Sequence, residues 1–117
     1  MSLSNSGWFE PLRSVDYTVI TDTFKVLGSK FSYPINYMDI TNLTDKVIEI
    51  GIANPASTAI QIKTLAYNAT WVFDISSNKT NGKEGSLSKG TQLYLRYRGL
   101  VAPTTGTVDV TTFYTID

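Results

Sequence analysis

The sequence contains neither cysteine nor histidine. The lack of cysteine excludes disulfides, thiolate zinc sites and cysteine nucleophiles, so stability must come from packing alone. The lack of histidine removes the commonest general base, the commonest side-chain metal ligand and every serine–histidine triad. These absences favour a protein that is not an enzyme and that needs no metal or other cofactor.

Net charge and long apolar runs are also missing. The 10 Lys and Arg residues balance the 10 Asp and Glu residues, so we expect neither nucleic acid nor a membrane as a partner. No apolar stretch approaches the roughly 20 residues of a membrane span. The start MSLSNSGWFEPLR lacks the charged and apolar regions of a signal peptide. We therefore expect a protein that is made in a cytoplasm and is not secreted.

Three Asn-X-Thr triplets, at residues 42–44, 68–70 and 78–80, match the acceptor pattern for N-glycosylation. The pattern matters only in a secreted protein. In a chain rich in Asn and Thr that has no secretion signal, we interpret all three as coincidence.

The chain is dominated by short segments in which apolar and polar residues alternate, separated by Gly, Pro, Asn or Asp, and no segment has the period of an amphipathic helix. Such alternation places successive side chains on opposite faces of a strand. The predicted strands lie within residues 15–26, 35–43, 46–53, 59–65, 70–75, 90–100 and 107–116. Apolar faces are clearest at Ile48, Ile50 and Ile52.

A chain of this length is one domain, and sheets without helices must pack on each other or close into a barrel. We predict an all-β, antiparallel β-sandwich of seven or eight strands over residues 15–117. A jelly roll is favoured over an immunoglobulin-like arrangement, because the buried Cys and its Trp partner are missing. Within residues 15–26 the apolar phase switches, which indicates a bulge or a strand that passes from one sheet to another.

Two segments outside the strands each have two interpretations. Residues 76–90 form a long connection that only Leu87 could attach to the body, either as a mobile loop or as a loop that orders against a partner. Residues 1–14 are predicted to be a flexible arm. Its apolar residues, which include Trp8 and Phe9, either plug the end of the sandwich or dock on another subunit.

The acidic residues do not form a catalytic pair. Asp39, Glu49, Asp74 and Asp109 each lie opposite the apolar phase of their strand, which indicates a solvated face. Neither a phosphate-binding loop nor a calcium loop is present.

A stripe of interface-type residues occurs in GTQLYLRYRGL, residues 90–100. Leu93, Leu95 and Tyr97 point to one face and the other face carries Tyr94, Arg96 and Arg98. Tyr and Arg are enriched at binding hot spots, so we predict a protein interface at these three residues, called the Tyr94 stripe below. The alternative is a salt-bridged surface in which Asp109 and its neighbours pair with the arginines.

Several short sequence segments together suggest a family. They are Leu27-Gly28, ITNLTD at 40–45, DISSNKT at 74–80, EGSLSKGTQLYLR at 84–96 and APTTGTVDVTTFY at 102–114. Over roughly residues 15–116 the chain resembles small virion structural proteins of tailed bacteriophages. The resemblance implies a non-enzymatic part of the virion, either a decoration or cement protein on the capsid or a neck or tail accessory. Its implied partners are the major capsid protein or other virion proteins, and further copies of itself in a homo-oligomer.

A carbohydrate-binding module is the alternative from another class of function. The 7 Tyr and 2 Trp residues could supply platforms for sugar stacking on a sandwich, with a glycan as partner. The competing interpretation places Tyr17, Trp71 and Tyr97 in the core. A hydrolase is the weakest option because no acid–base pair is in place for it.

Overall fold

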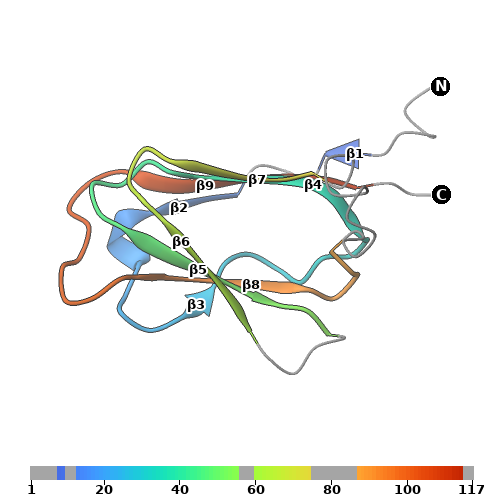
Figure 1. The fold of residues 1–117 in the computed structure, drawn as a ribbon, viewed down its shortest axis with the longest axis horizontal. Helices are drawn as coiled ribbons and strands as arrows, with labels where there is room; N and C mark the ends of the chain where they lie inside the picture. Colours follow the sequence, from blue (N-terminus) through green and yellow to red (C-terminus); the bar gives the residue numbers. More distant parts are fainter. Residues whose placement is uncertain (1–7, 10–12, 56–59, 75–86, 115–117) are drawn as a thin grey trace.

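A computed structural model describes residues 8–9, 13–55, 60–74 and 87–114 (Figure 1). The described residues form nine strands and one short 3-10 helix. The strands are β1 Trp8–Phe9, β2 Arg13–Asp16, β3 Lys25–Val26, β4 Ile35–Asn42, β5 Ile48–Ala53, β6 Gln61–Leu65, β7 Thr70–Asp74, β8 Gln92–Tyr97 and β9 Thr107–Tyr114. Within these ranges no helix is long and apolar enough to cross a membrane.

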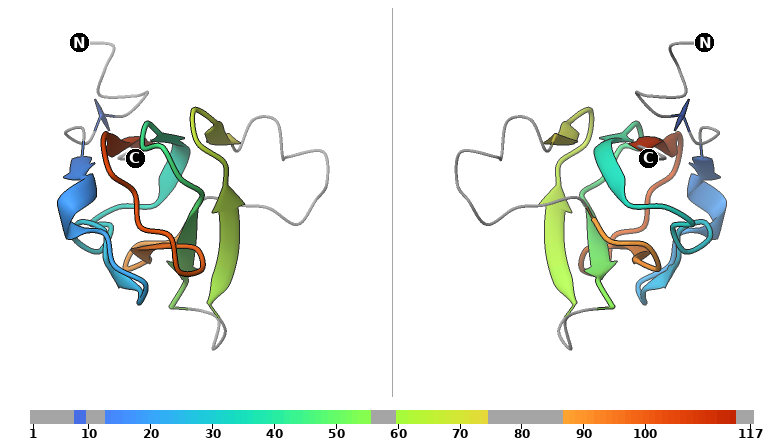
Figure 2. Two further views of the ribbon diagram at one scale, coloured as in Figure 1. Left: turned by 90° about the vertical axis from the view of Figure 1, so that its left-hand side faces the viewer. Right: turned by 90° about the vertical axis from the view of Figure 1, so that its right-hand side faces the viewer.

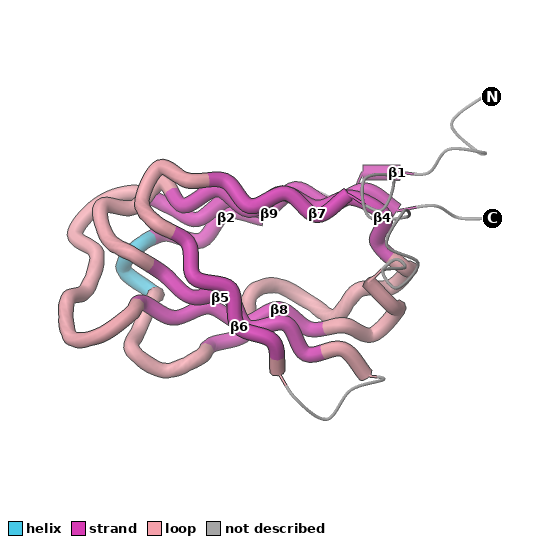
Figure 3. Tube along the Cα trace, in the orientation of Figure 1, coloured by secondary structure: helices cyan, strands magenta, loops and turns pink. Residues whose placement is uncertain are grey.

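The strands form two antiparallel sheets that pack face to face (Figures 1 and 3). The five-stranded sheet has the order β1-β9-β4-β7, with β2 also paired to β9, and the four-stranded sheet has the order β3-β8-β5-β6. Both β1 and β2 pair with β9, β1 with residues 113–114 and β2 with residues 107–110. The structure thus confirms the predicted antiparallel β-sandwich.

The connectivity is that of a jelly roll. β5 pairs with β6, β4 with β7, β3 with β8 and β2 with β9, so the chain is one long hairpin of four nested pairs. Two further pairings, β4 with β9 and β5 with β8, roll this hairpin into the two sheets. The last two strands lie in different sheets, which excludes the immunoglobulin-like alternative.

The core lies between the inner faces of the sheets and follows the alternation in the sequence. The side chains of Ile48, Ile50 and Ile52 are at most 5% exposed, and those of Leu93 and Leu95 on the neighbouring strand at most 3%. Across the sandwich they face buried residues of β4 and β9, namely Met38, Ile40, Val108 and Val110. Trp71, Phe73 and Tyr97 pack against this core and are partly buried.

The predicted strand at 15–26 is wrong in its middle. After β2 the chain makes a 3-10 turn over Tyr17–Val19, in which Asp16 accepts hydrogen bonds from the amide and hydroxyl of Thr18. These bonds hold the pKa of Asp16 below its ordinary value. The chain then enters the other sheet as β3. Of the two interpretations of the phase switch, passage between sheets is confirmed.

Leu87 attaches the end of the 76–90 connection to the body, as predicted. Its backbone amide and carbonyl exchange hydrogen bonds of 3.0 and 2.8 Å with Ile35. Its side chain packs against the core. Residues 76–86 lie outside the described residues, as do residues 1–7, 10–12, 75 and 115–117 of the predicted arm and strands.

At the edge of the sandwich formed by β6 and β7, the Lys63 side chain lies over the indole ring of Trp71. Figure 2 shows the N-terminal strands (blue) at one side of the molecule and β6 and β7 (yellow-green) at the other. At the β6–β7 side, Lys63 occupies a core-facing register position and its Nζ lies 5.6 Å from the centre of the Trp71 ring. A charge that points inward at an edge strand discourages pairing with another sheet edge.

Candidate binding surfaces

An apolar row crosses the whole outer face of the four-stranded sheet. Val26 lies opposite Tyr94, Tyr94 opposite Gly51, and Gly51 opposite Ile62. Val26 is 62% exposed and Ile62 is 52% exposed. The outer face of a sandwich sheet ordinarily carries polar residues, so an apolar row that spans four strands is a candidate contact surface. We call it the Tyr94 face.

Gly51 forms the floor of the Tyr94 face. A Cβ at this position would lie 3.2 Å from Cγ2 of Ile60 and 3.3 Å from both Cε1 of Phe24 and Cβ of Tyr94. Neighbouring side chains therefore cover Gly51, which is buried although it occupies an outer-face position of the sheet. The rings of Phe24 and Tyr94 meet edge to face at 6.4 Å. The face is thus a packed apolar layer.

Arg96 borders this layer and is held from two directions. Its Nε donates to Oε1 of Glu49 at 2.7 Å, and its guanidinium lies 4.1 Å from the centre of the Phe24 ring. Glu49 lies opposite Arg96 in the register of β5 and β8. The sequence suggested Asp109 as the partner of the arginines, and this is wrong for Arg96. Asp109 lies in the other sheet and accepts from the hydroxyls of Ser14 and Thr107.

Arg98 differs from Arg96. It follows the end of β8, its side chain is exposed, and its amide donates to the carbonyl of Val47 at 3.2 Å. The Tyr94 stripe therefore divides into a packed part, Tyr94 and Arg96, and an exposed charge at Arg98. An exposed guanidinium just beyond the end of β8, the strand that carries Tyr94, suits a partner that offers a carboxylate.

A smaller hollow of about 280 Å³ adjoins Tyr94 on the side toward Gln92, at the end of β8 that lies away from Arg98. Lys30, Asn54 and Gln92 are among its polar residues, and Gln92 donates to the carbonyl of Gly28 at 2.8 Å. It extends the apolar row with polar groups, as the rim of a protein interface does.

The two interface candidates in the N-terminal segment lie on the other sheet. Trp8 and Phe9 form β1, whose backbone pairs with Tyr114 and Phe113 of β9. Their side chains are outside the described residues, so both interpretations of these side chains remain predictions.

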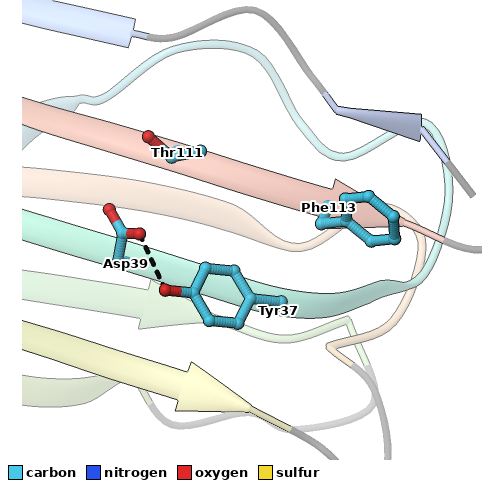
Figure 4. A pocket seen from close by; sticks show the side chains of 4 residues that line it. All are labelled: Tyr37, Asp39, Thr111 and Phe113. Atoms are coloured by element: carbon cyan, nitrogen blue, oxygen red, sulfur yellow. Dashed lines mark hydrogen bonds between the residues drawn. The ribbon is translucent and has the colours of Figure 1, made fainter.

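A second hollow, of about 460 Å³, lies on the outer face of the five-stranded sheet and is lined by Tyr37, Asp39, Thr111 and Phe113 (Figure 4). Tyr37 lies opposite Phe113, and Asp39 lies opposite Thr111, in the pairing of β4 with β9. The hydroxyl of Tyr37 donates to Oδ2 of Asp39 at 2.9 Å. We call this site the Tyr37 hollow.

Neither Tyr37 nor Phe113 was among the site residues predicted from the sequence. The signal was present, since both occupy outward positions in alternating strands. However, the two residues are far apart in the chain, and only the register of β4 with β9 places them side by side. Of the four outward acids, the register gives Asp39, Glu49 and Asp109 outer-face positions next to hydroxyl or arginine partners.

No protein-family model, no curated protein and no solved structure matches the chain. Within the described residues, no group of three or more acidic side chains is placed to hold a metal ion. The described surfaces offer an apolar layer on one sheet, with the exposed Arg98 beyond the end of β8, and an aromatic hollow with a carboxylate on the other sheet. Both are features of recognition.

Proposed function

We propose that this chain is a non-enzymatic structural protein of a bacteriophage virion, specifically a decoration or cement protein that binds capsid subunits and its own copies. The observation that carries the proposal is the Tyr94 face. Its row leaves the apolar side chains of Val26 and Ile62, at the two edges of the sheet, more than half exposed, with the partly buried Tyr94 ring between them. A partner would remove these side chains from water.

Two further points support the proposal. The jelly roll is an architecture that viral capsid proteins use, although lectins use it as well, so this support is an analogy of fold. The resemblance of the turn and strand phrases to small phage virion proteins is independent of that analogy. A neck or tail accessory protein of the virion is the alternative position, because a tail ring presents repeated protein surfaces in the same way.

The expected contact has an apolar centre and a charged border. Val26, Tyr94 and Ile62 would meet apolar side chains of a capsid subunit, while Arg98 would pair with an acidic residue of that subunit. Arg96 is already engaged by Glu49 and Phe24, so it supports the layer without being free to reach a partner. The protein would be assembled onto particles in the host cytoplasm.

The test is the copy number of the chain in purified phage particles, measured by quantitative mass spectrometry against the major capsid protein. Parity with the capsid protein supports a decoration or cement role. A copy number per particle that corresponds to a single small ring of subunits supports the neck or tail alternative. Absence of the chain from particles would overturn the virion proposal in both forms.

A matched pair of variants tests the surface. Ile62→Glu places a charge in the apolar row, and Val72→Glu places the same charge at a site of similar exposure, 50%, on the outer face of the other sheet. We expect both variants to fold, Ile62→Glu to be lost from sedimented particles and Val72→Glu to remain bound. Equal binding of the two variants would remove the Tyr94 face from the proposal.

A further inference from the structure

The Tyr37 hollow combines two aromatic rings with a carboxylate and a hydroxyl. Figure 4 shows the Tyr37 and Phe113 rings on neighbouring strands, with the Tyr37 hydroxyl directed to Asp39, and Thr111 before Phe113 on β9. A hollow of about 460 Å³ is in the size range of small-molecule sites, which are typically aromatic with a few convergent polar groups. The site lies on the sheet opposite the Tyr94 face.

We propose that the Tyr37 hollow binds a neutral saccharide. The apolar C–H face of a pyranose ring stacks on the electron-rich faces of aromatic rings, and the rings of Tyr37 and Phe113, opposite each other on β4 and β9, both line the hollow. Stacking alone would not orient a sugar. The carboxylate of Asp39 beside them provides acceptors for sugar hydroxyls.

The hydrogen bond from Tyr37 prepares Asp39 for this role. A carboxylate accepts about four hydrogen bonds, and the Tyr37 hydroxyl occupies one position on Oδ2. The bond fixes the orientation of the carboxylate before a ligand arrives, so less side-chain entropy is lost on binding. The Thr111 hydroxyl, opposite Asp39 in the register, adds a group that both donates and accepts.

The charges on this sheet select against acidic sugars. Strands β4, β7 and β9, which carry the hollow and its neighbours, have Asp39, Asp74 and Asp109 in their sequences and no Lys or Arg, while the edge strand β2 has Arg13 and Asp16. A uronic acid or a sialic acid would bring a carboxylate to a face that already repels it. The specificity expected from the structure is therefore for neutral hexoses and their N-acetylated forms.

This inference does not depend on the proposed function. It uses the outer face of the five-stranded sheet, whereas particle binding uses the outer face of the four-stranded sheet. A decoration protein bound through the Tyr94 face would keep the hollow open to solvent. Copy number in particles and sugar binding by the isolated chain can each fail without the other.

The experiment is a titration of the ¹⁵N-labelled full chain, followed by NMR, with neutral tetrasaccharides built from glucose, galactose, mannose and N-acetylglucosamine. Trigalacturonate serves as the acidic comparison. We expect at least one neutral sugar to shift the amide signals of Tyr37, Asp39 and Phe113 with a millimolar dissociation constant. Trigalacturonate should leave the signals unchanged.

Three variants connect the binding to the proposed groups. Phe113→Ala removes one ring and Asp39→Asn removes the carboxylate charge, and each should weaken binding about tenfold or more. Asp109→Asn is the matched control, since it changes an acid on the same face that does not line the hollow. It should bind as the unaltered chain does. Unchanged thermal unfolding shows that the variants are folded.

Each contrary result has a definite meaning. Absence of shifts with all four neutral sugars would overturn the proposal. So would tighter binding of trigalacturonate than of any neutral sugar, or retained binding in both Phe113→Ala and Asp39→Asn. Shifts at the hollow with tetramethylammonium, but with no sugar, would replace the saccharide by an organic cation held by the rings and Asp39.

Discussion

Arg96 and Glu49 form an ion pair across neighbouring strands, with Nε of Arg96 2.7 Å from Oε1 of Glu49. The pair is only partly exposed, at 32% for the Arg96 side chain and 15% for that of Glu49. The guanidinium also covers the Phe24 ring. Arg96 therefore fastens the packed layer of the Tyr94 face, while Arg98 remains exposed for contact with a partner.

The two arginines should consequently differ in their effect on stability. Arg96→Ala loses the ion pair and the ring contact and should lower the free energy of unfolding by about 1 to 2 kcal/mol. Arg98→Ala, the matched control, should change it by less than about 0.5 kcal/mol. Urea unfolding of both variants measures the difference. Equal losses of unfolding free energy in the two variants would contradict the conclusion that Arg96 is packed and Arg98 is exposed.

Asn42 should be among the most sensitive polar residues. Its buried side chain donates to the carbonyls of Lys46 and Leu65 and accepts from the amide and hydroxyl of Thr44. Asn42→Ala leaves these groups without partners, and we expect a loss of about 2 to 4 kcal/mol in urea unfolding. If Asn42→Ala lowered the free energy of unfolding by less than a typical surface substitution does, water would be satisfying the hydrogen-bonding groups that the Asn42 amide now pairs with. The same burial makes this first Asn-X-Thr triplet unsuited to glycosylation in the folded chain.

Thr112 should be improved by substitution. Its hydroxyl is buried in the core and has no hydrogen-bond partner among the described residues. Thr112→Val keeps the shape and removes the polar atom, so we expect a gain of about 1 kcal/mol and a higher midpoint of thermal unfolding. Thr44→Val is the control, because the Thr44 hydroxyl donates to Asn42 at 2.7 Å and its removal should destabilise. A lower midpoint for Thr112→Val would refute the prediction.

Gly106 occupies a position that only glycine suits. Its φ is +96°, and a Cβ there would overlap the backbone carbonyl of Leu43. Gly99 has a similar φ of +75° with open space around it. We expect Gly99→Ala to cost about 1 kcal/mol from backbone strain alone and Gly106→Ala to cost more than about 3 kcal/mol. Similar losses in the two variants would mean that the 43–44 backbone moves aside.

Asp45 gives the stability a dependence on acid pH. The hydroxyl and amide of Thr104 donate to its carboxylate at 2.5 and 2.8 Å and lower its pKa from 3.8 to about 2. Because the pKa of Asp45 is lower in the folded chain than in the unfolded chain, its ionised carboxylate stabilises the fold at pH values above about 4. This stabilisation is lost as the pH falls from about 4 to about 2. Asp45→Asn should lose less stability than the unaltered chain over that window. Parallel urea-unfolding profiles for the two proteins would contradict the assignment.

The sequence by itself determined the fold class, most strands and the inward residues, because the alternation that marks a strand is local in the chain. Ile48, Ile50 and Ile52, and Leu93 with Leu95, lie in the core as their spacing predicts. The jelly roll was favoured over its immunoglobulin-like alternative only on a missing Cys and Trp pair. The nested pairing of the strands decided it.

Only the tertiary structure decided which residues meet across strands. The partner of Arg96 is Glu49, and Tyr37 joins Asp39 and Phe113, through registers between segments that are distant in the chain. Alternation says which face a side chain takes but not which residue lies opposite it, since a shift of register by two residues preserves every face. The 3-10 turn at Tyr17–Val19 was missed for a related reason. There the hydrogen bonds of Asp16 to Thr18 override a pattern that favours a strand.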